Sequence, residues 1–166
     1  VGSFITETLS KEVPDTARTL LESNVKDEER HDLALGYVAD VHGLDKKAEK
    51  EAKLLRDAWI AHPDHTILKA LVAERAIFFV ILPFNRFCGD AALRTVSADI
   101  SRDEQIHVAC NSLVCADMGL RPSSSLDKLR KATINWIFEP LADIAPNKYL
   151  SRKFWTDSSD RLMSVS

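Results

Sequence analysis

The sequence has little of what would build a membrane protein or a nucleic-acid-binding surface. Its longest apolar run, residues 76–84, is far shorter than the roughly 20 residues that cross a bilayer. The formal net charge is −3 at pH 7, so the chain does not carry the strong positive charge typical of nucleic-acid partners. We therefore expect neither a membrane nor a nucleic acid among its partners.

Cysteine is also scarce, and the three present are Cys88, Cys110 and Cys115, with no Cys-x-x-Cys pair. An odd number of thiols, together with an N-terminus that has no apolar signal segment, is typical of a protein in the reducing cytosol. We expect a cytoplasmic protein whose cysteines are small buried apolar residues rather than metal ligands.

Glycine and proline number only five and six, and they fall between long segments with helical punctuation. Asp45, Asp64 and Asp90 are candidate N-caps, and Pro83 should kink the helix that contains it. No segment shows the alternation of a strand, and no linker divides the chain. The sequence predicts a single all-α domain over 1–166. The expected helices span 15–42, 46–61, 64–87, 90–119, a segment from 126 that is disturbed at Pro140, and 148–163.

Two Glu-x-x-His pairs stand in the middle of expected helices, Glu28 with His31 and Glu104 with His107. Residues i and i+3 lie on one face of a helix, so each pair presents a carboxylate and an imidazole together. A lone Glu74 lies on the expected helix between them, beside a strongly apolar run. Two such pairs and further glutamates, all facing a bundle interior, make the di-iron or di-manganese site of ferritin-like proteins.

The depth of these residues in their helices agrees with a shared site. Glu28, Glu74 and Glu104 follow the expected helix starts by 13, 10 and 14 residues, or roughly 15–21 Å at about 1.5 Å per residue. In neighbouring antiparallel helices, such mid-helix positions meet at one level. Phe78 and Ile100 stand one turn from Glu74 and Glu104, and would form a dry pocket where dioxygen could bind.

The residue types favour iron or manganese, because carboxylates and neutral imidazoles suit these ions, whereas thiolates suit zinc. Asp103 directly precedes Glu104 and can accept the second ring N–H of a ligand histidine. A solvated helix face is the alternative interpretation of each Glu-x-x-His pair, and charged neighbours such as Asp27 favour it at Glu28. It explains Glu74 poorly, since a lone carboxylate among apolar residues is costly unless cations pair with it.

The stretch Ile100-Ser101-Arg102-Asp103-Glu104-Gln105-Ile106-His107 resembles the Ile-x-Arg-Asp-Glu-x-x-His signature of the small subunit of class I ribonucleotide reductase. Residues 73–79 are similar to that family's third-ligand helix, and residues 160–163 resemble a motif on a late helix. The resemblance implies a ferritin-like bundle, a homodimer and a dinuclear iron or manganese centre that activates dioxygen. It also implies a large catalytic subunit as partner. The implied metal ligands are Glu28, His31, Glu74, Glu104 and His107, and the residue implied to link the site to radical transfer is Asp103.

The chain departs from this family in three places. The sixth ligand, usually an Asp on a preceding helix, would lie upstream of Val1, and Glu7 and Glu12 are candidates only by default. The position of the radical tyrosine holds Leu35, and Tyr37 faces elsewhere, at about 200° around the helix. The family's C-terminal tail would follow Met163, so we expect a ferritin-like core trimmed at both ends, or a reduced variant.

Three other functions remain open from the sequence. A different dimetal oxidase or oxygenase of the same superfamily would use the space left by Leu35 for a substrate. An iron-storage protein would need the four-helix spacing of a cage-forming ferritin, which is not clear here. A non-catalytic subunit that pairs with an active paralogue would explain both the missing sixth ligand and the missing tyrosine.

Overall fold

The computed structural model describes residues 1–11 and 13–164, and within them the chain is all-helical, with no β-strand. This confirms the predicted all-α class. The α-helices are α1 (Gly2–Leu9), α2 (Asp15–His42), α3 (Lys46–Ala61), α4 (Thr66–Ala73), α5 (Phe79–Cys88), α6 (Ala91–Asp117), α7 (Ser124–Phe138) and α8 (Arg152–Ser164). A π-helical turn, η1 (Glu74–Phe78), joins α4 to α5, and a 3-10 turn, η2 (Lys148–Leu150), precedes α8.

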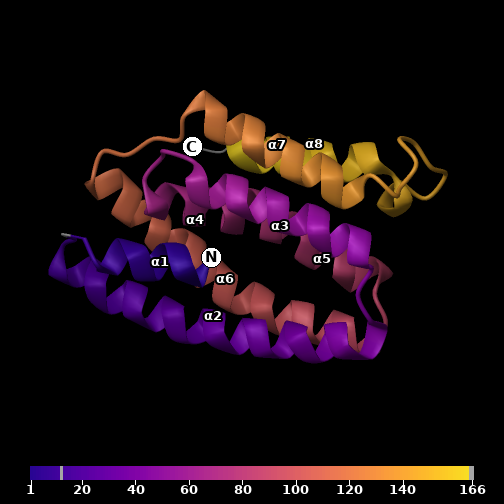
Figure 1. The fold of residues 1–166 in the computed structure, drawn as a ribbon, viewed down its shortest axis with the longest axis horizontal. Coiled ribbons are helices and arrows are strands. Elements are labelled where there is room, and N and C mark those ends of the chain that lie inside the picture. The colour runs from indigo at the N-terminus through magenta and orange to yellow at the C-terminus, as the bar shows by residue number, and fades with distance from the viewer. Residues whose placement is uncertain (12, 165–166) are drawn as a thin grey trace.

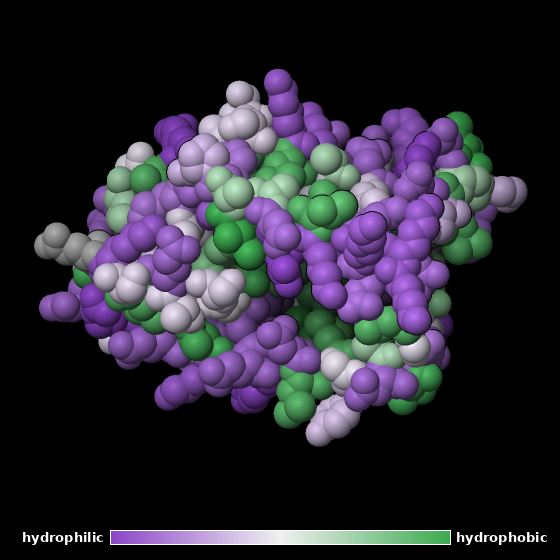
Figure 2. All heavy atoms as spheres, in the orientation of Figure 1, coloured by the Kyte–Doolittle hydropathy of each residue, from purple (hydrophilic) through white to green (hydrophobic). Residues whose placement is uncertain are grey.

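The long helices α2 and α6 pack against each other along one side of the molecule, and α4, η1 and α5 pack against α6 (Figure 1). Helix α1 packs on both α2 and α4, while α7 and α8 pair on the opposite side and contact η1. Helix α3 carries mostly exposed charged residues, and hydrophilic side chains crowd that face in Figure 2. The turn η1 therefore lies between α6 on one side and α7 and α8 on the other.

Several helix starts and ends differ from the sequence prediction. The cap of α4 is His65, whose ring nitrogen Nδ1 accepts from the Ile67 N–H, while Asp64 instead accepts the Ser123 N–H at 2.9 Å. Helix α7 begins at Ser124, because the Ser123 hydroxyl caps it, and not at Leu126. These are local side-chain choices among several neighbouring cap residues, which spacing alone does not distinguish.

The ends of α6 and α8 differ too. Helix α6 ends at Asp117, and Gly119 follows with φ +65°, so that the Leu120 N–H can donate to the Cys115 carbonyl. This is a glycine C-cap: the residue with positive φ turns the backbone so that N–H groups after the helix donate to its last carbonyls. Residues 148–150 form a separate turn before α8 instead of its first turn.

Two features of the fold were not expected. Helix α1 is only eight residues long, too short for a clear periodic pattern, yet Phe4, Ile5 and Thr8 are buried against the core. A kink was expected at Pro83, which lies within α5. The departure from α-helical hydrogen bonding is the π turn that begins at Glu74. Cys110 and Cys115 are buried as predicted, whereas Cys88 is exposed.

Candidate metal centre

The middle turns of α2 and α6 bring the two Glu-x-x-His pairs face to face, and η1 adds a fifth side chain. Each of the five is at least nine-tenths buried. They are Glu28 and His31 from α2, Glu74 from η1, and Glu104 and His107 from α6. The structure thus brings together all five residues that the sequence singled out as metal ligands. Burial of Glu28 to 6% exposure also rules out the solvated-face interpretation of that pair.

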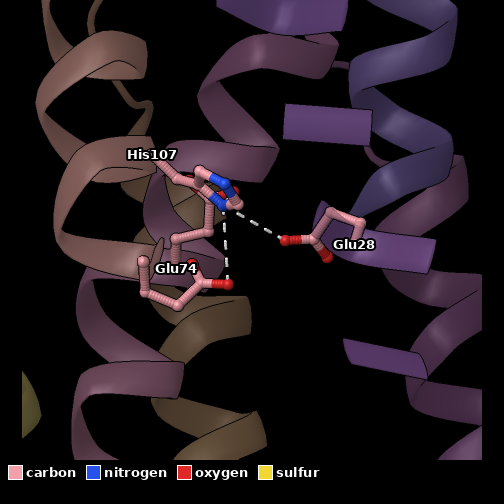
Figure 3. A group of neighbouring side chains, drawn as sticks. Glu28, Glu74 and His107 are labelled. Carbon is pink, nitrogen blue, oxygen red and sulfur yellow. Dashed lines mark ion pairs between the residues drawn. The ribbon is translucent and has the colours of Figure 1, made fainter. Parts of the chain in front are cut away.

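The ligand atoms converge on one point. Glu28, Glu74, Glu104 and His107 each offer an atom within 4.8 Å of the others. Nδ1 of His107 lies 3.4 Å from a Glu28 oxygen and 4.0 Å from a Glu74 oxygen (Figure 3). Nδ1 of His31 lies 3.3 Å from a Glu104 oxygen. Two ligands of one ion, each about 2.1 Å from it, stand up to about 4.2 Å apart, so these spacings fit an ion between the side chains.

Hydrogen bonding within the described residues leaves the centre of this cluster unsatisfied. Buried atoms with no hydrogen-bond partner there include Glu28 Oε1, Glu74 Oε1, both Glu104 carboxylate oxygens and His107 Nδ1. Buried polar atoms are normally paired, and several in one place call for a ligand. The cluster of Glu28, Glu74, Glu104 and His107 can therefore hold a metal ion, and its oxygen and nitrogen donors suit iron or manganese.

Electrostatics in the metal-free cluster show what an ion would replace. Burial lowers the histidine pKa values, but contacts with Glu104 and Glu28 outweigh it and raise them to about 10 for His31 and about 11 for His107. Burial, and then repulsion from Glu104 and Glu28, raise the pKa of Glu74 to about 8. Protons therefore compensate the carboxylates at neutral pH, and a bound cation would displace them.

Each histidine is oriented by an aspartate from the opposite helix. Nε2 of His31 on α2 lies 2.9 Å from Oδ2 of Asp103 on α6, and Nε2 of His107 on α6 lies 3.1 Å from Oδ2 of Asp27 on α2. In the neutral histidine, donation from Nε2 leaves the Nδ1 lone pair toward the cluster, as a metal ligand requires. Asp103 thus has the orienting contact expected for it.

Sequence reasoning missed Asp27, and it missed an amide pair beside Glu74. The signal for Asp27 was present, because Asp-Glu-x-x-His occurs twice, at 27–31 and 103–107. Asn111 donates to Glu74 Oε2 at 2.6 Å and accepts from Asn24 at 3.4 Å, with both amides buried. A lone Asn inside a helix has no sequence signature, so only the structure identifies this pair.

The remaining candidates lie away from the cluster or outside the described residues. Glu7 is exposed and forms an ion pair with Lys11 at 3.1 Å, so it is not a sixth ligand, and Glu12 lies outside the described residues. Leu35 is 39% exposed, and Tyr37 is 65% exposed. The start of α1 does pass the site, since a Cβ added to Gly2 would stand 3.1 Å from the Glu28 Cβ.

Comparisons with known proteins add no relative to this description: no family model, curated protein or solved structure matches the chain. Among the described residues, no helix has both the length and the apolar character needed to cross a membrane.

Proposed function

We propose that this chain is the small subunit of a ribonucleoside-diphosphate reductase, an oxidoreductase with a ferritin-like bundle and a dinuclear iron or manganese centre. One observation carries the proposal: buried Glu28, Glu74, Glu104 and His107 converge, His31 lies 3.3 Å from Glu104, and each histidine is held by an aspartate of the facing helix. The resemblance of residues 100–107 to the small-subunit signature selects this function among dimetal proteins.

In the proposed centre, Glu28, His31, Glu74, Glu104 and His107 hold the metals. Bound iron or manganese would supply the activation of dioxygen and an oxidising equivalent for a large catalytic subunit that makes deoxyribonucleotides. The protein keeps the ligand histidines in position and excludes water from the carboxylates, which are fully or nearly fully buried. Asp103 contacts His31 and has a side chain 35% exposed, which supports its proposed role in linking the centre to the partner surface.

A homodimer in the cytoplasm belongs to the same proposal. Leu33, Tyr37 and Val41 are spaced by four residues on α2, and each is more than half exposed. Such an apolar stripe on a helix suits burial against a second copy of the chain. The cysteines are unpaired in the structure, which suits a reducing compartment.

The experiment that tests the proposal is metal content per chain after anaerobic loading with Fe(II) or Mn(II). Two tightly bound ions per chain support a dinuclear centre, and the loaded protein is then assayed for oxygen consumption and for nucleotide reduction with a large subunit. One ion or none contradicts the dinuclear centre in this chain.

A different dimetal oxidase is the second candidate, and a cavity of about 390 Å³ favours it. Ile77 and Phe78 of the π turn line this cavity together with Trp59. The cavity is therefore next to the turn that carries Glu74. With Leu35 in place of a tyrosine, an apolar substrate bound there would take the oxidising equivalent. Oxygen consumption by the loaded protein that an apolar substrate stimulates, with no nucleotide reduction, would select this function.

A further inference from the structure

Helix α8 makes a single buried hydrogen bond to the π turn that carries Glu74. The Ser159 hydroxyl donates to the Ala76 carbonyl at 2.6 Å, across 83 residues of sequence. Ser159 is fully buried, and Ala76 is the third residue of the five-residue turn. The metal-ligand segment is therefore held from the side opposite α2 and α6.

A carbonyl oxygen can only accept, so the Ser159 hydroxyl is the donor to Ala76, and the acceptor side of the same hydroxyl is taken by Arg130 of α7. Its Nη1 donates to the Ser159 oxygen at 2.6 Å. A guanidinium group can only donate, so the serine oxygen must accept from it. The single hydroxyl hydrogen of Ser159 is left for the Ala76 carbonyl, so this one hydroxyl links Arg130 of α7 to the π turn.

Arg130 is itself anchored at the surface end of α7 and α8. It is 1% exposed, and three more of its N–H groups donate, two to Asp127 at 2.7 and 2.8 Å and one to Asp160 at 2.8 Å. The two carboxylates are partly exposed, at 33% and 54% of their side chains. A buried guanidinium whose charge is compensated, and four of whose five N–H donors are occupied, is a rigid support.

The π turn is the element that needs such support. The Phe79 N–H donates to the Glu74 carbonyl five residues earlier, a pattern that is rare and tends to be found at functional sites. Glu74 is also fixed at its side chain by Asn111. The hydrogen bond from Ser159 holds the backbone of the same turn, so the carboxylate is restrained at both ends.

We propose that Ser159, oriented by Arg130, is a positioning residue of the metal centre: through the Ala76 carbonyl it holds the π turn and so holds Glu74 at the cluster. The expected effect on ion binding rests on the proposed metal-binding function. The support of the π turn by Ser159 does not depend on a bound ion. Helix α8 thereby becomes part of the site without contributing a ligand.

The test compares Ser159→Ala with Ser158→Ala, a matched control on the same helix. Ser158 also accepts from an arginine, Arg161, but its hydroxyl donates to the Phe154 carbonyl of its own helix. Amide hydrogen exchange of the metal-free proteins is the first readout. Ser159→Ala should speed exchange at residues 77–81 by about fivefold to tenfold, and Ser158→Ala should leave those amides unchanged.

The second readout is anaerobic Co(II) binding, which reports ligand geometry through the visible spectrum. Ser159→Ala should weaken at least one ion by about tenfold and shift the cobalt bands, whereas a change confined to general stability would shift neither. Asp160→Asn loosens Arg130 from the exposed side and should produce a smaller change in the same direction. Exchange at residues 77–81 within about twofold of the control in both Ser159→Ala and Asp160→Asn would overturn the inference.

The two readouts separate this inference from the proposed function. If the unsubstituted protein binds no ion, the metal proposal fails, and hydrogen exchange alone decides whether Ser159 holds the π turn. If the protein binds two ions and exchange responds while the cobalt spectrum does not, the turn is supported by Ser159 but Glu74 is not positioned through it, and the inference is wrong.

Discussion

Two parts of the buried interior differ in how their side chains are satisfied. Where α5, α7 and α8 meet, Phe84, Phe138 and Trp155 form edge-to-face and stacked contacts with ring centroids 5.3–5.8 Å apart. The Trp155 indole N–H donates to the Tyr149 carbonyl at 2.9 Å. At the metal centre, buried carboxylate oxygens and an imidazole nitrogen have no hydrogen-bond partner within the described residues.

One of these regions stabilises the fold by itself, and the other depends on a ligand. The aromatic cluster buries large rings and needs nothing further. The metal centre gathers like charges in a dry interior, which costs stability until cations or protons compensate them. We expect substitutions in the two regions to differ in ion binding, which should change only at the candidate metal centre.

The largest expected effect is the loss of an ion on Glu104→Ala. Glu104 is fully buried and faces both histidines at 3.3–3.6 Å, so its removal takes away a central candidate ligand. The metal-free variant should still fold, because the apolar core is unchanged, but it should lose stability at neutral pH, because Glu104 is the main contact that raises the pKa values of His31 and His107. Metal analysis and thermal unfolding measure the two expectations, and near-native metal content would remove Glu104 from the ligand set.

Phe138→Ala should lower stability and leave ion binding unchanged. Phe138 is 1% exposed and contacts Phe84 and Trp155, and truncation of a buried Phe costs about 3–5 kcal/mol. Denaturant unfolding measures this loss, while the number of ions bound per folded chain should not change. A loss of metal content in folded Phe138→Ala protein would contradict the separation of the two regions.

The next effect concerns pH and distinguishes the regions without mutation. The pKa values of His31 and His107 are raised to about 10 and 11, and that of Glu74 to about 8. Groups with raised pKa values stabilise the fold fully below their ordinary values, and this contribution is lost as pH rises through the folded values. The metal-free protein should therefore lose stability continuously between about pH 6 and pH 9, and further as the pH rises toward about 11.

Denaturant unfolding of chelator-treated protein at several pH values measures this slope. Phe138→Ala should keep the slope at lower overall stability, and Glu104→Ala should flatten it, because the histidines lose a carboxylate partner. With metal bound, stability should instead rise over this range, since the ligands must be deprotonated. A flat profile in metal-free protein would show that the cluster is not buried in solution.

The smallest expected effects are those of Asp27→Asn and Asp103→Asn, which retain the shape of each histidine's partner. Loss of such an orienting carboxylate lowers metal affinity by about 10–100-fold. We expect the two variants to bind metal similarly, because the two contacts are alike, at 3.1 and 2.9 Å. Only Asp103→Asn should also reduce turnover with a large subunit, and equal turnover in both would remove Asp103 from the transfer route.

The sequence was sufficient for the helical class and for most helix positions, because long periodic segments with few glycines and prolines leave little choice. It also identified the five side chains that the structure brings together, since Glu-x-x-His spacing fixes a shared helix face. Sequence was least informative where a contact joins distant segments. The Asn24–Asn111 pair and the Ser159–Ala76 hydrogen bond depend on tertiary packing that no local pattern encodes.

Asp27 shows a different limit. Its charged neighbours made it look like part of a solvated face, and its side chain is indeed 23% exposed. The same side chain contacts His107 of the facing helix. Asp27 is therefore partly exposed to solvent and also in contact with a buried histidine. The repeated Asp-Glu-x-x-His order was the better guide to its position than the charge of its surroundings.

The π turn has a consequence for the lengths of chain that this fold accepts. A π turn holds one residue more than an α turn, and each residue of an α-helix advances the face by about 100°. The extra residue is therefore absorbed within the turn, so α4 and α5 can both keep their apolar faces toward the core. Deleting one residue from the turn after Glu74 would leave an ordinary α turn with α5 near its present face. Adding one more residue there would rotate α5 by about 100° and carry Val80 and Leu82 out of the core. The chain should thus accept the loss of one residue at this turn more readily than the gain of one.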